Sequence, residues 1–202
     1  MRGTGDINSD GADDLIWRHS TGDIAYWVLD SAGKMISGDS MGSVSPDWSL
    51  AARGDIDGDG VVDFIWKHTS GHIAYWLLNA DGSHKAGDFI GCVSTEWTVC
   101  GLGDIDRDGH DDIIWRHTSG ENAYWFLNED GTRKSGGSIS YASPSWTMSA
   151  VGDIDGDGTV DIIWRHTSGD ITFWLLDAEA KIKSGGTIGN ISSGWTICGS
   201  GR

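Results

Sequence analysis

Short apolar runs separated by polar turns recur along the whole chain. Between residues 63 and 102 four of these runs follow one another, at 63–68, 73–78, 85–90 and 97–102. Most are rich in aromatic and β-branched residues, and Ser-Gly, Asp-Gly or other glycine-rich turns bound them, which is typical of short strands. The run at 73–78 (IAYWLL) has no strongly polar residue, which indicates a strand that is covered on both faces. We therefore expect four short strands in each such segment.

The pattern repeats with a period of 49 residues, without insertion or deletion. Gly-Asp pairs at 5/6, 54/55, 103/104 and 152/153 mark four repeat units, which are 6–54, 55–103, 104–152 and 153–201. A repeat of about 50 residues that carries four short antiparallel strands matches one blade of a β-propeller. The sequence thus predicts an all-β protein in which residues 1–202 form a single propeller domain.

All twelve tryptophans occupy equivalent positions, three in each unit. The first two of each unit lie within apolar runs, so we expect them in the core between neighbouring blades. The third follows a polar linker, and two interpretations stay open for it, core or rim. The first position holds Trp17, Trp66, Trp115 and Trp164; the second holds Trp27, Trp76, Trp125 and Trp174; the third holds Trp48, Trp97, Trp146 and Trp195.

Each Gly-Asp pair opens an acidic loop: the first loop is 6–14 (DINSDGADD), the second 55–63 (DIDGDGVVD), the third 104–112 (DIDRDGHDD) and the fourth 153–161 (DIDGDGTVD). When the first aspartate is position 0, side-chain oxygens fall at positions 0, 2, 4 and 8, and glycine falls at position 5. In a tight loop this alternation points the oxygens at one centre, the glycine permits the turn, and the carbonyl at position 6 adds a ligand. The predicted metal ligands are Asp6, Asn8, Asp10, Ala12, Asp14, Asp55, Asp57, Asp59, Val61, Asp63, Asp104, Asp106, Asp108, His110, Asp112, Asp153, Asp155, Asp157, Thr159 and Asp161.

Ligation by oxygen alone suits a hard cation, and calcium fits better than magnesium because magnesium gives up its water reluctantly. An EF-hand is ruled out because the glutamate that it needs at its twelfth residue is a tryptophan in all four loops. The bidentate role therefore falls to the aspartate at position 8. The competing interpretation is an acidic turn that binds nothing, but four copies of mutually repelling carboxylates favour a bound cation.

The loop Gly-Asp-Ile-Asp-Gly-Asp-Gly, followed by a strand, resembles the FG-GAP/VCBS repeat, the calcium-loop blade of integrin α-chain propellers. The continuation Ile-Trp-Arg-His-Thr-Ser-Gly with Tyr-Trp-Leu-Leu resembles bacterial VCBS-type blades and the Psathyrella velutina-type lectin propellers. This resemblance covers the whole chain and implies a β-propeller with structural calcium. In the lectin branch it also implies carbohydrate bound in clefts between blades. Lectins of this kind form seven-bladed rings, whereas this chain has four units.

Charge and composition narrow the function classes. A formal net charge of -16 opposes nucleic-acid binding, which needs Lys and Arg to neutralise phosphates. No apolar stretch approaches the roughly 20 residues of a membrane helix. Three cysteines without a C-x-x-C spacing argue against a zinc ribbon or a disulfide framework, and for Cys92 and Cys100 one bridge and two free thiols both stay open. The sequence starts without a leader, and calcium sites of ordinary affinity favour an extracellular or cell-surface setting.

A catalytic role finds no support in the motifs. The sequence contains no G-x-S-x-G, no H-E-x-x-H and no P-loop. His19, His68, His117 and His166 recur once in each unit, whereas an active site is usually built from unique residues that converge in one pocket. The carboxylates that a glycoside hydrolase would use are already assigned to the metal. We expect a protein that is not an enzyme.

The direction of the strands brings a second set of residues together. If the first strand of a blade runs toward the acidic loop, the second strand returns and ends at an Arg/Lys-His-Thr-Ser-Gly turn, on the same face as the linker to the next blade. An indole beside Arg, His and hydroxyl groups suits a pyranose, because the sugar's apolar face stacks on the ring and its hydroxyls find polar partners. The alternative is that the Arg and Lys side chains only hold neighbouring blades together. The candidate ligand residues are Trp48, Trp97, Trp146, Trp195, Arg18, Lys67, Arg116, Arg165, His19, His68, His117 and His166.

Two functions remain open. The first is a calcium-stabilised, lectin-like protein that binds carbohydrate at several clefts, so that avidity compensates for weak single sites. The second is a non-catalytic structural, adhesion or self-assembling scaffold that binds protein partners. For assembly, residues 1–5 are expected to be the tail of a first strand, and residues 195–201 a spare strand that completes this blade. Exchange of the spare strand in a homodimer would close an eight-bladed ring, and a four-bladed monomer is the second choice.

Overall fold

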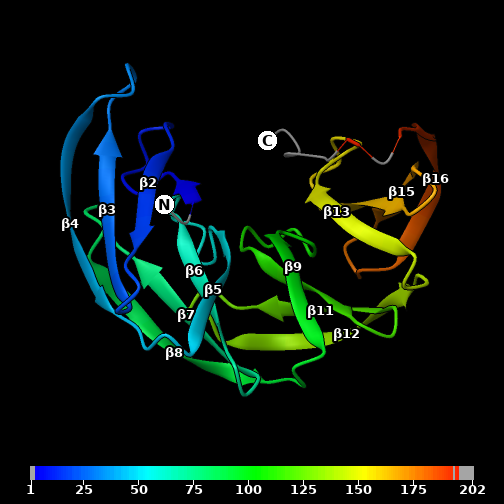
Figure 1. Cartoon of the computed structure of the whole chain (residues 1–202), viewed down its shortest axis with the longest axis horizontal. Coiled ribbons are helices and arrows are strands. Elements are labelled where there is room, and N and C mark those ends of the chain that lie inside the picture. The colour runs from blue at the N-terminus through cyan, green and yellow to red at the C-terminus, as the bar shows by residue number, and fades with distance from the viewer. Residues whose placement is uncertain (1–2, 193, 196–202) are drawn as a thin grey trace. The chain divides into compact units, whose positions relative to one another are not determined.

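The computed structural model describes residues 3–192 and 194–195, and in this part of the chain it contains strands and no helix. Sixteen strands form four antiparallel sheets of four strands each (Figure 1). The first sheet holds β1 (Gly3–Gly5), β2 (Asp14–Arg18), β3 (Asp23–Leu29) and β4 (Met35–Ser43). The second holds β5 (Trp48–Gly54), β6 (Asp63–His68), β7 (His72–Leu78) and β8 (His84–Cys92). The all-β prediction of four-stranded antiparallel blades is confirmed.

The third and fourth sheets repeat this plan. The third holds β9 (Trp97–Gly103), β10 (Asp112–His117), β11 (Glu121–Leu127) and β12 (Arg133–Tyr141). The fourth holds β13 (Trp146–Gly152), β14 (Asp161–His166), β15 (Asp170–Leu176) and β16 (Ile182–Asn190). In every sheet consecutive strands are neighbours, and the acidic loop connects the first strand to the second.

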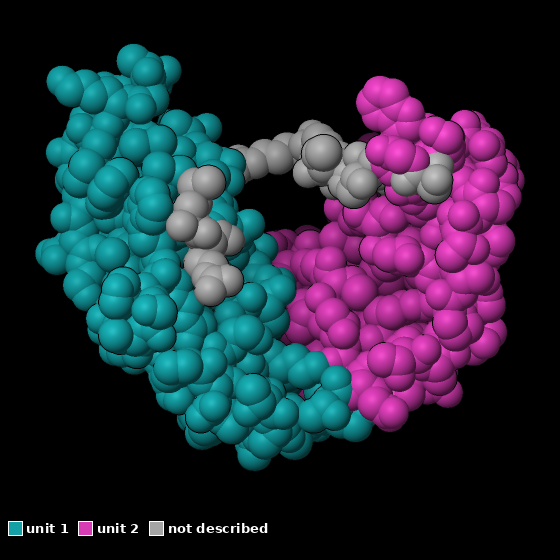
Figure 2. Space-filling model, viewed as in Figure 1, with its two compact units in different colours: residues 1–95, 129–132 teal, residues 96–128, 133–202 magenta. Residues whose placement is uncertain are grey.

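The chain divides into two compact units, which Figure 2 colours separately. Unit 1 comprises residues 1–95 and 129–132 and contains the first and second sheets. Unit 2 comprises residues 96–128 and 133–202 and contains the third and fourth sheets. Each unit has its own core, in which apolar residues of its two sheets pack together. The core of unit 1 includes Ile16, Ile24, Phe64 and Trp66, and that of unit 2 includes Ile114, Phe126, Ile162 and Trp164.

Of the eight tryptophans expected in the core, four are buried, one is exposed, and three are half-buried, namely Trp17, Trp76 and Trp174. Trp66, Trp115 and Trp164 are at most 2% exposed. Trp27, which was expected in the core, is 41% exposed, so that expectation is wrong. Its neighbours on β3, Tyr26 and Val28, point into the core of unit 1. Because side chains alternate along a strand, Trp27 points to the face of the first sheet that the second sheet does not cover.

Three further expectations concern smaller features. Cys92 and Cys100 are both free thiols, so the single bridge between them is not formed. Residues 3–5 pair with β2 as the short first strand of the first sheet. Of the strand expected at 195–201, only Trp195 belongs to the described residues, and the rest of it lies outside them. In the described part of the chain, no helix has the length and apolar character needed to cross a membrane.

Candidate functional site

The aspartate at position 8 ties each acidic loop to the rest of its sheet. Asp63 is fully buried, and its Oδ2 accepts a hydrogen bond from the Ile56 N–H at 2.9 Å. Its Oδ1 accepts a second one from the Leu78 N–H of β7, also at 2.9 Å. The same two bonds join Asp14 to Ile7 and Leu29, Asp112 to Ile105 and Leu127, and Asp161 to Ile154 and Leu176. One carboxylate therefore links the start of the loop, the second strand and the third strand.

The other aspartates hold the turn itself. Asp55 at position 0 accepts a hydrogen bond from the Gly60 N–H at 2.9 Å, and Asp59 at position 4 accepts one from the Val61 N–H at 2.9 Å. Gly60 has a φ of 83°, a conformation that side chains with a Cβ rarely adopt, so position 5 requires glycine. Each of the other loops repeats these bonds. The predicted ligand role of the position-6 carbonyls of Ala12, Val61, His110 and Thr159 stays a prediction.

The loops bring their carboxylates close enough to share a cation. In three loops, one oxygen from each of three aspartates lies within 4.8 Å of the others, namely Asp55, Asp57 and Asp63; Asp104, Asp106 and Asp108; and Asp153, Asp155 and Asp161. Asp106 Oδ1 is buried and accepts no hydrogen bond from the described residues, as expected for an oxygen that a cation would satisfy. The residues present therefore fit a hard cation bound through oxygen. In the first loop Asn8 replaces an aspartate, and its amide donates to Asp10 at 2.9 Å.

When no cation is present, burial makes it costly to ionise Asp63 and Asp112, which both lie at position 8. Loss of solvation raises the pKa of Asp63 to about 7, and the same cause raises the pKa of Asp112 to about 7. Neighbouring carboxylates at positions 2 and 4 add to both shifts. In the fourth loop the hydrogen bond from Lys183 lowers the pKa of Asp157. Asp63 and Asp112 therefore gain most from a nearby positive charge.

Lysines that the sequence analysis missed supply positive charge in three loops. Lys85 Nζ lies 2.6 Å from Asp57 Oδ2 and 2.7 Å from Asp59 Oδ2. Lys134 contacts Asp106 and Asp108 in the same way, and Lys183 contacts Asp155 and Asp157. The 49-residue spacing of the three lysines was visible in the sequence. Their contact with the loops was not, because it depends on how the fourth strand of each sheet is placed.

The third loop also reaches the fourth. Arg107, at position 3 of the third loop, lies 2.8 Å from Asp157 Oδ2 of the fourth loop. Its Nε donates to the Thr159 hydroxyl at 2.7 Å. The second and fourth loops have glycine at position 3, and the first has serine. Asp157 thus meets two basic side chains, Arg107 and Lys183.

At the other end of the sheets, the linkers meet the turns as predicted. The Thr69 N–H donates to the Asp47 carbonyl at 2.9 Å, which joins the turn after β6 to the linker before β5. The equivalent bonds run from Thr118 to Glu96 and from Thr167 to Ser145. Turn and linker therefore lie at one end of the second, third and fourth sheets, while the acidic loop connects the opposite ends of the same strands.

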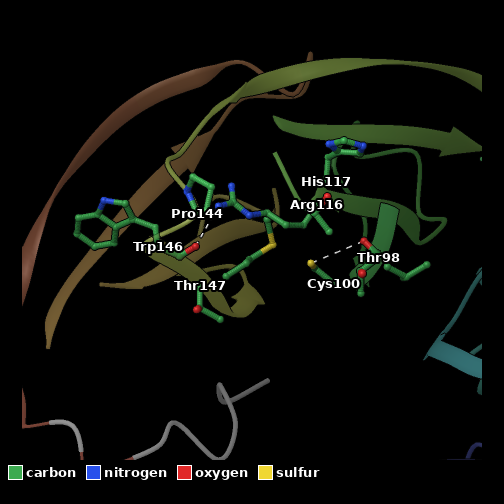
Figure 3. Close-up of a pocket in the computed structure, with 10 residues that line it drawn as sticks. Thr98, Cys100, Arg116, His117, Pro144, Trp146 and Thr147 are labelled. Atoms are coloured by element: carbon green, nitrogen blue, oxygen red, sulfur yellow. Dashed lines mark hydrogen bonds between the residues drawn. The ribbon is translucent and has the colours of Figure 1, made fainter. Parts of the chain in front are cut away.

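A cleft opens at this end in each unit. In unit 2 it has a volume of about 480 Å³, and Figure 3 shows the residues that line it. The third sheet supplies Arg116 and His117, the linker to the fourth sheet supplies Pro144, and β13 supplies Trp146. In unit 1 a cleft of about 310 Å³ is lined by Arg18 and His19 together with Pro46 and Trp48. The two clefts use equivalent residues two repeats apart, so the structure brings together one predicted Arg–His pair and one predicted tryptophan in each unit.

The arginines of these clefts are held by the backbone. Arg116 donates to the carbonyls of Ala142, Ser143 and Trp146 at 2.9 to 3.0 Å, and the last of these bonds is drawn in Figure 3. Its guanidinium also lies 4.8 Å from the centre of the Trp164 ring. In unit 1, Arg18 donates to the Ser45 carbonyl at 2.9 Å. Such contacts favour the structural interpretation of the arginines, in which they fix the linker and the cleft wall.

The remaining predicted residues fall into pairs and single positions. Trp48 packs on His68, Trp97 on His117 and Trp146 on His166, with ring centres 4.7 to 4.9 Å apart. The three tryptophans are half-buried, so both the core and the rim interpretation hold in part. Trp195 is 66% exposed, and Arg165 donates to its carbonyl. Lys67 and His68 belong to unit 1, and Trp97 belongs to unit 2.

A further cleft of unit 1 was not predicted. It has a volume of about 370 Å³ and shares Trp48 with the cleft described above. Its wall includes Trp76, Asp88 and Phe89, and Phe89 is 62% exposed although its ring lies 5.9 Å from that of Trp48. The equivalent positions of the other repeats hold Ser40, Ser138 and Thr187. An exposed aromatic residue at one repeat only marks a local specialisation.

The comparisons with known proteins fit this geometry. A family model described as FG-GAP-like repeat matches residues 55–115 and 104–164, which together span 110 of the 202 residues. The chain belongs to the FG-GAP repeat family. The match covers the second, third and fourth acidic loops in full, so the FG-GAP repeat coincides with the loop-and-strand pattern. The resemblance to an FG-GAP β-propeller is thus confirmed, whereas the resemblance to a lectin remains a hypothesis.

Solved structures are similar to this FG-GAP protein, and the first of those described here supports the fold. A crystal structure of a nidogen/laminin complex matches 88% of the chain with a TM-score of 0.55 at 12% identity. A Bacteroides caccae protein of unknown function matches 86% at a TM-score of 0.48 and 8% identity, and a Dos1 propeller matches 92% at 0.47 and 9%. The chain spans 61%, 57% and 51% of the lengths of these three chains, respectively. A comparison with the curated proteins found no match.

Proposed function

We propose that this FG-GAP repeat protein is a calcium-stabilised module that binds carbohydrate, without catalysis, at clefts repeated between its sheets. The observation that carries the proposal is the recurrence of one cleft in both units, with the same Arg, His, Pro and Trp positions. A cleft that recurs within one chain suits a ligand that offers the same group more than once. Several weak sites on one molecule then act together, because the second binding event becomes intramolecular.

The chemistry of the cleft walls supports a sugar as the ligand. In unit 2, Trp146 offers an indole, and Thr98, Thr118 and Thr147 bring hydroxyl groups to the same cleft. A pyranose has apolar C–H faces and polar edges, so it pairs with such a mixed wall better than a purely apolar ligand does. The guanidinium of Arg116 is occupied by backbone carbonyls, so its part is to keep the wall in place.

The acidic loops support a role for calcium in stability. They lie at the strand ends remote from the clefts, and their carboxylates would hold the ion through the aspartates at positions 0, 2, 4 and 8. When bound, calcium supplies the positive charge that offsets the mutual repulsion of the buried carboxylates. In this proposal the metal stabilises the fold, and the sugar is bound by the clefts. An extracellular or cell-surface setting, where calcium is abundant, is consistent with this assignment.

A glycan array tests the proposal directly. We expect the calcium-loaded protein to bind a subset of glycans, and the double variant Trp48→Ala/Trp146→Ala to lose that signal. Trp27→Ala is the matched control, since Trp27 is a partly exposed tryptophan that lines neither cleft. An array without any signal in calcium would contradict the proposal. That result would favour the alternative, a non-catalytic scaffold that binds protein partners.

A further inference from the structure

In the second, third and fourth sheets, a β-bulge near the start of the last strand directs one side chain toward the acidic loop. In the second sheet Leu77 pairs with Ala86 and Leu78 with His84, so Lys85 is the extra residue. Lys134 and Lys183 are the extra residues of the same bulge in the third and fourth sheets. Bulges redirect a side chain and are enriched next to functional sites. The position of each lysine beside its loop therefore follows from the backbone geometry of the bulge.

Each bulge lysine contacts the same two loop positions. The ammonium group lies 2.5 to 2.9 Å from Oδ2 of the aspartates at positions 2 and 4 in all three loops. Both aspartates are among the residues assigned above to the cation. The lysine side chains are 39 to 43% exposed, so they can swing away into solvent at a moderate cost.

The first loop provides the internal comparison. Its bulge residue is Ile36, which is 60% exposed and carries no charge. The carboxylate at position 4, Asp10, is bonded there by the neutral Asn8 amide. The first loop thus lacks both the carboxylate at position 2 and the bulge lysine that contacts this position in the other three loops. The position-2 carboxylate and its lysine partner vary together, as expected if the lysine balances that carboxylate.

We propose that Lys85, Lys134 and Lys183 are built-in counter-ions that hold the metal-free loops together and must be displaced when calcium binds. The inference rests on the proposed calcium role of the loops. An ammonium held between the aspartates at positions 2 and 4 repels a divalent cation that the same two aspartates would bind. The lysines therefore weaken calcium binding in the second, third and fourth loops, while protecting the loops when calcium is scarce.

Calorimetric titration of calcium into EDTA-stripped, dialysed protein tests the inference. The variant Lys85→Met/Lys134→Met removes two of the contacts and keeps the length of the side chains. An exposed ion pair contributes up to about 1 kcal/mol, so we expect the calcium Kd of two sites to fall by about fivefold. The control is Lys34→Met/Lys181→Met, which makes the same change in net charge away from the loops. We also expect the melting temperature in EDTA to fall in the first variant and to stay unchanged in the control.

The outcomes separate the two proposals. A folded variant whose calcium affinity equals or falls below that of the original protein overturns the counter-ion role and leaves the calcium proposal standing. Calcium binding by the variant, but not by the original protein, supports the counter-ion role and contradicts calcium as a resident ion. If neither protein binds calcium, both proposals fail.

The reverse substitution avoids any doubt about lost stability. Ile36→Lys adds the missing charge at an exposed bulge position of the first loop. We expect one of the calcium sites to weaken by about fivefold, again the value of an exposed ion pair. Four unchanged sites would overturn the inference.

Discussion

At one end of each sheet the acidic loop makes the same hydrogen bonds four times, whereas at the other end the side chains change from sheet to sheet. Every position-8 aspartate accepts the same two backbone N–H groups. At the turn end, the position of Arg116 is Lys67 in the second sheet, and the linker residue is Asp47, Glu96 or Ser145. The linker-to-turn hydrogen bond is nevertheless kept in the last three sheets. Uniform hydrogen bonds thus mark the structural end, and variable side chains on a constant backbone mark the opposite end, which we propose as the recognition end.

The largest expected effect comes from comparing a core tryptophan, Trp66, with a cleft tryptophan, Trp48. Trp66 is 2% exposed and packs between the sheets of unit 1, so Trp66→Ala is expected to lower the free energy of unfolding by about 3–5 kcal/mol. Trp48→Ala removes a half-buried ring and is expected to cost clearly less. Urea unfolding of both variants measures the difference. Equal losses would mean that Trp48 is a core residue, and the comparison of the two ends would break at that point.

The next effect tests the structural end. Asp112→Ala leaves the N–H groups of Ile105 and Leu127 without their acceptor, at about 1–2 kcal/mol for each buried donor. We therefore expect a loss of about 2–4 kcal/mol in urea unfolding, measured in EDTA so that metal does not contribute. Glu129→Ala, in an exposed turn, is the control and should unfold like the original protein. Similar behaviour of the two variants would remove the special role of position 8.

A smaller effect sharpens the comparison among the loops. Arg107→Gly copies the glycine of the second and fourth loops and removes the contact with Asp157. Because exposed ion pairs contribute up to about 1 kcal/mol, we expect the fourth loop to bind calcium by about two- to fivefold more tightly. Calcium titration by calorimetry measures this change. A weaker fourth site would show that Arg107 supports the cation site and does not compete with the cation.

The smallest effect probes the recognition end without changing stability. Cys100 lines the cleft of unit 2, and burial raises the pKa of its thiol to about 11. Only the thiolate is nucleophilic, so alkylation of Cys100 is expected to be slow at pH 8 and to accelerate as the pH rises toward 11. The exposed thiol of Cys92 serves as the comparison. Peptide mass spectrometry follows each cysteine separately. Rapid labelling of Cys100 at pH 8 would mean that the cleft wall is open to solvent.

The fold could be predicted from the sequence because the same weak pattern occurs in all four repeats. A single DIDGDGVVD segment is compatible with a turn that binds nothing, but four copies at one interval predict loops, strands and their order together. The strands beginning at Asp63 and Trp97 start at the expected residues. The turn-to-linker contact followed from strand direction alone, and the bond from Thr69 to Asp47 agrees with it.

Features that depend on register and on which face is covered were not accessible in this way. The sequence pattern of Trp27 matches that of Trp76 and Trp125, and only the placement of the sheets leaves Trp27 exposed. The contact of Lys85 with the second loop requires a bulge, whose position the apolar pattern does not encode. The donors of Arg116 were open to a ligand or to the backbone, and the positions of three carbonyls decide between them.

The thermal melting of the protein in calcium and in EDTA tests the central claim, that the acidic loops are cation sites that stabilise the fold. Binding to the native state alone adds RT ln(1 + [L]/Kd) for each site, about 2.7 kcal/mol when calcium exceeds Kd by a hundredfold. For a chain of this size each 1 kcal/mol raises the melting temperature by roughly 2–4 °C, so calcium is expected to raise it by several degrees even if a single loop is filled. A melting temperature that is the same in saturating calcium and in EDTA would contradict the account.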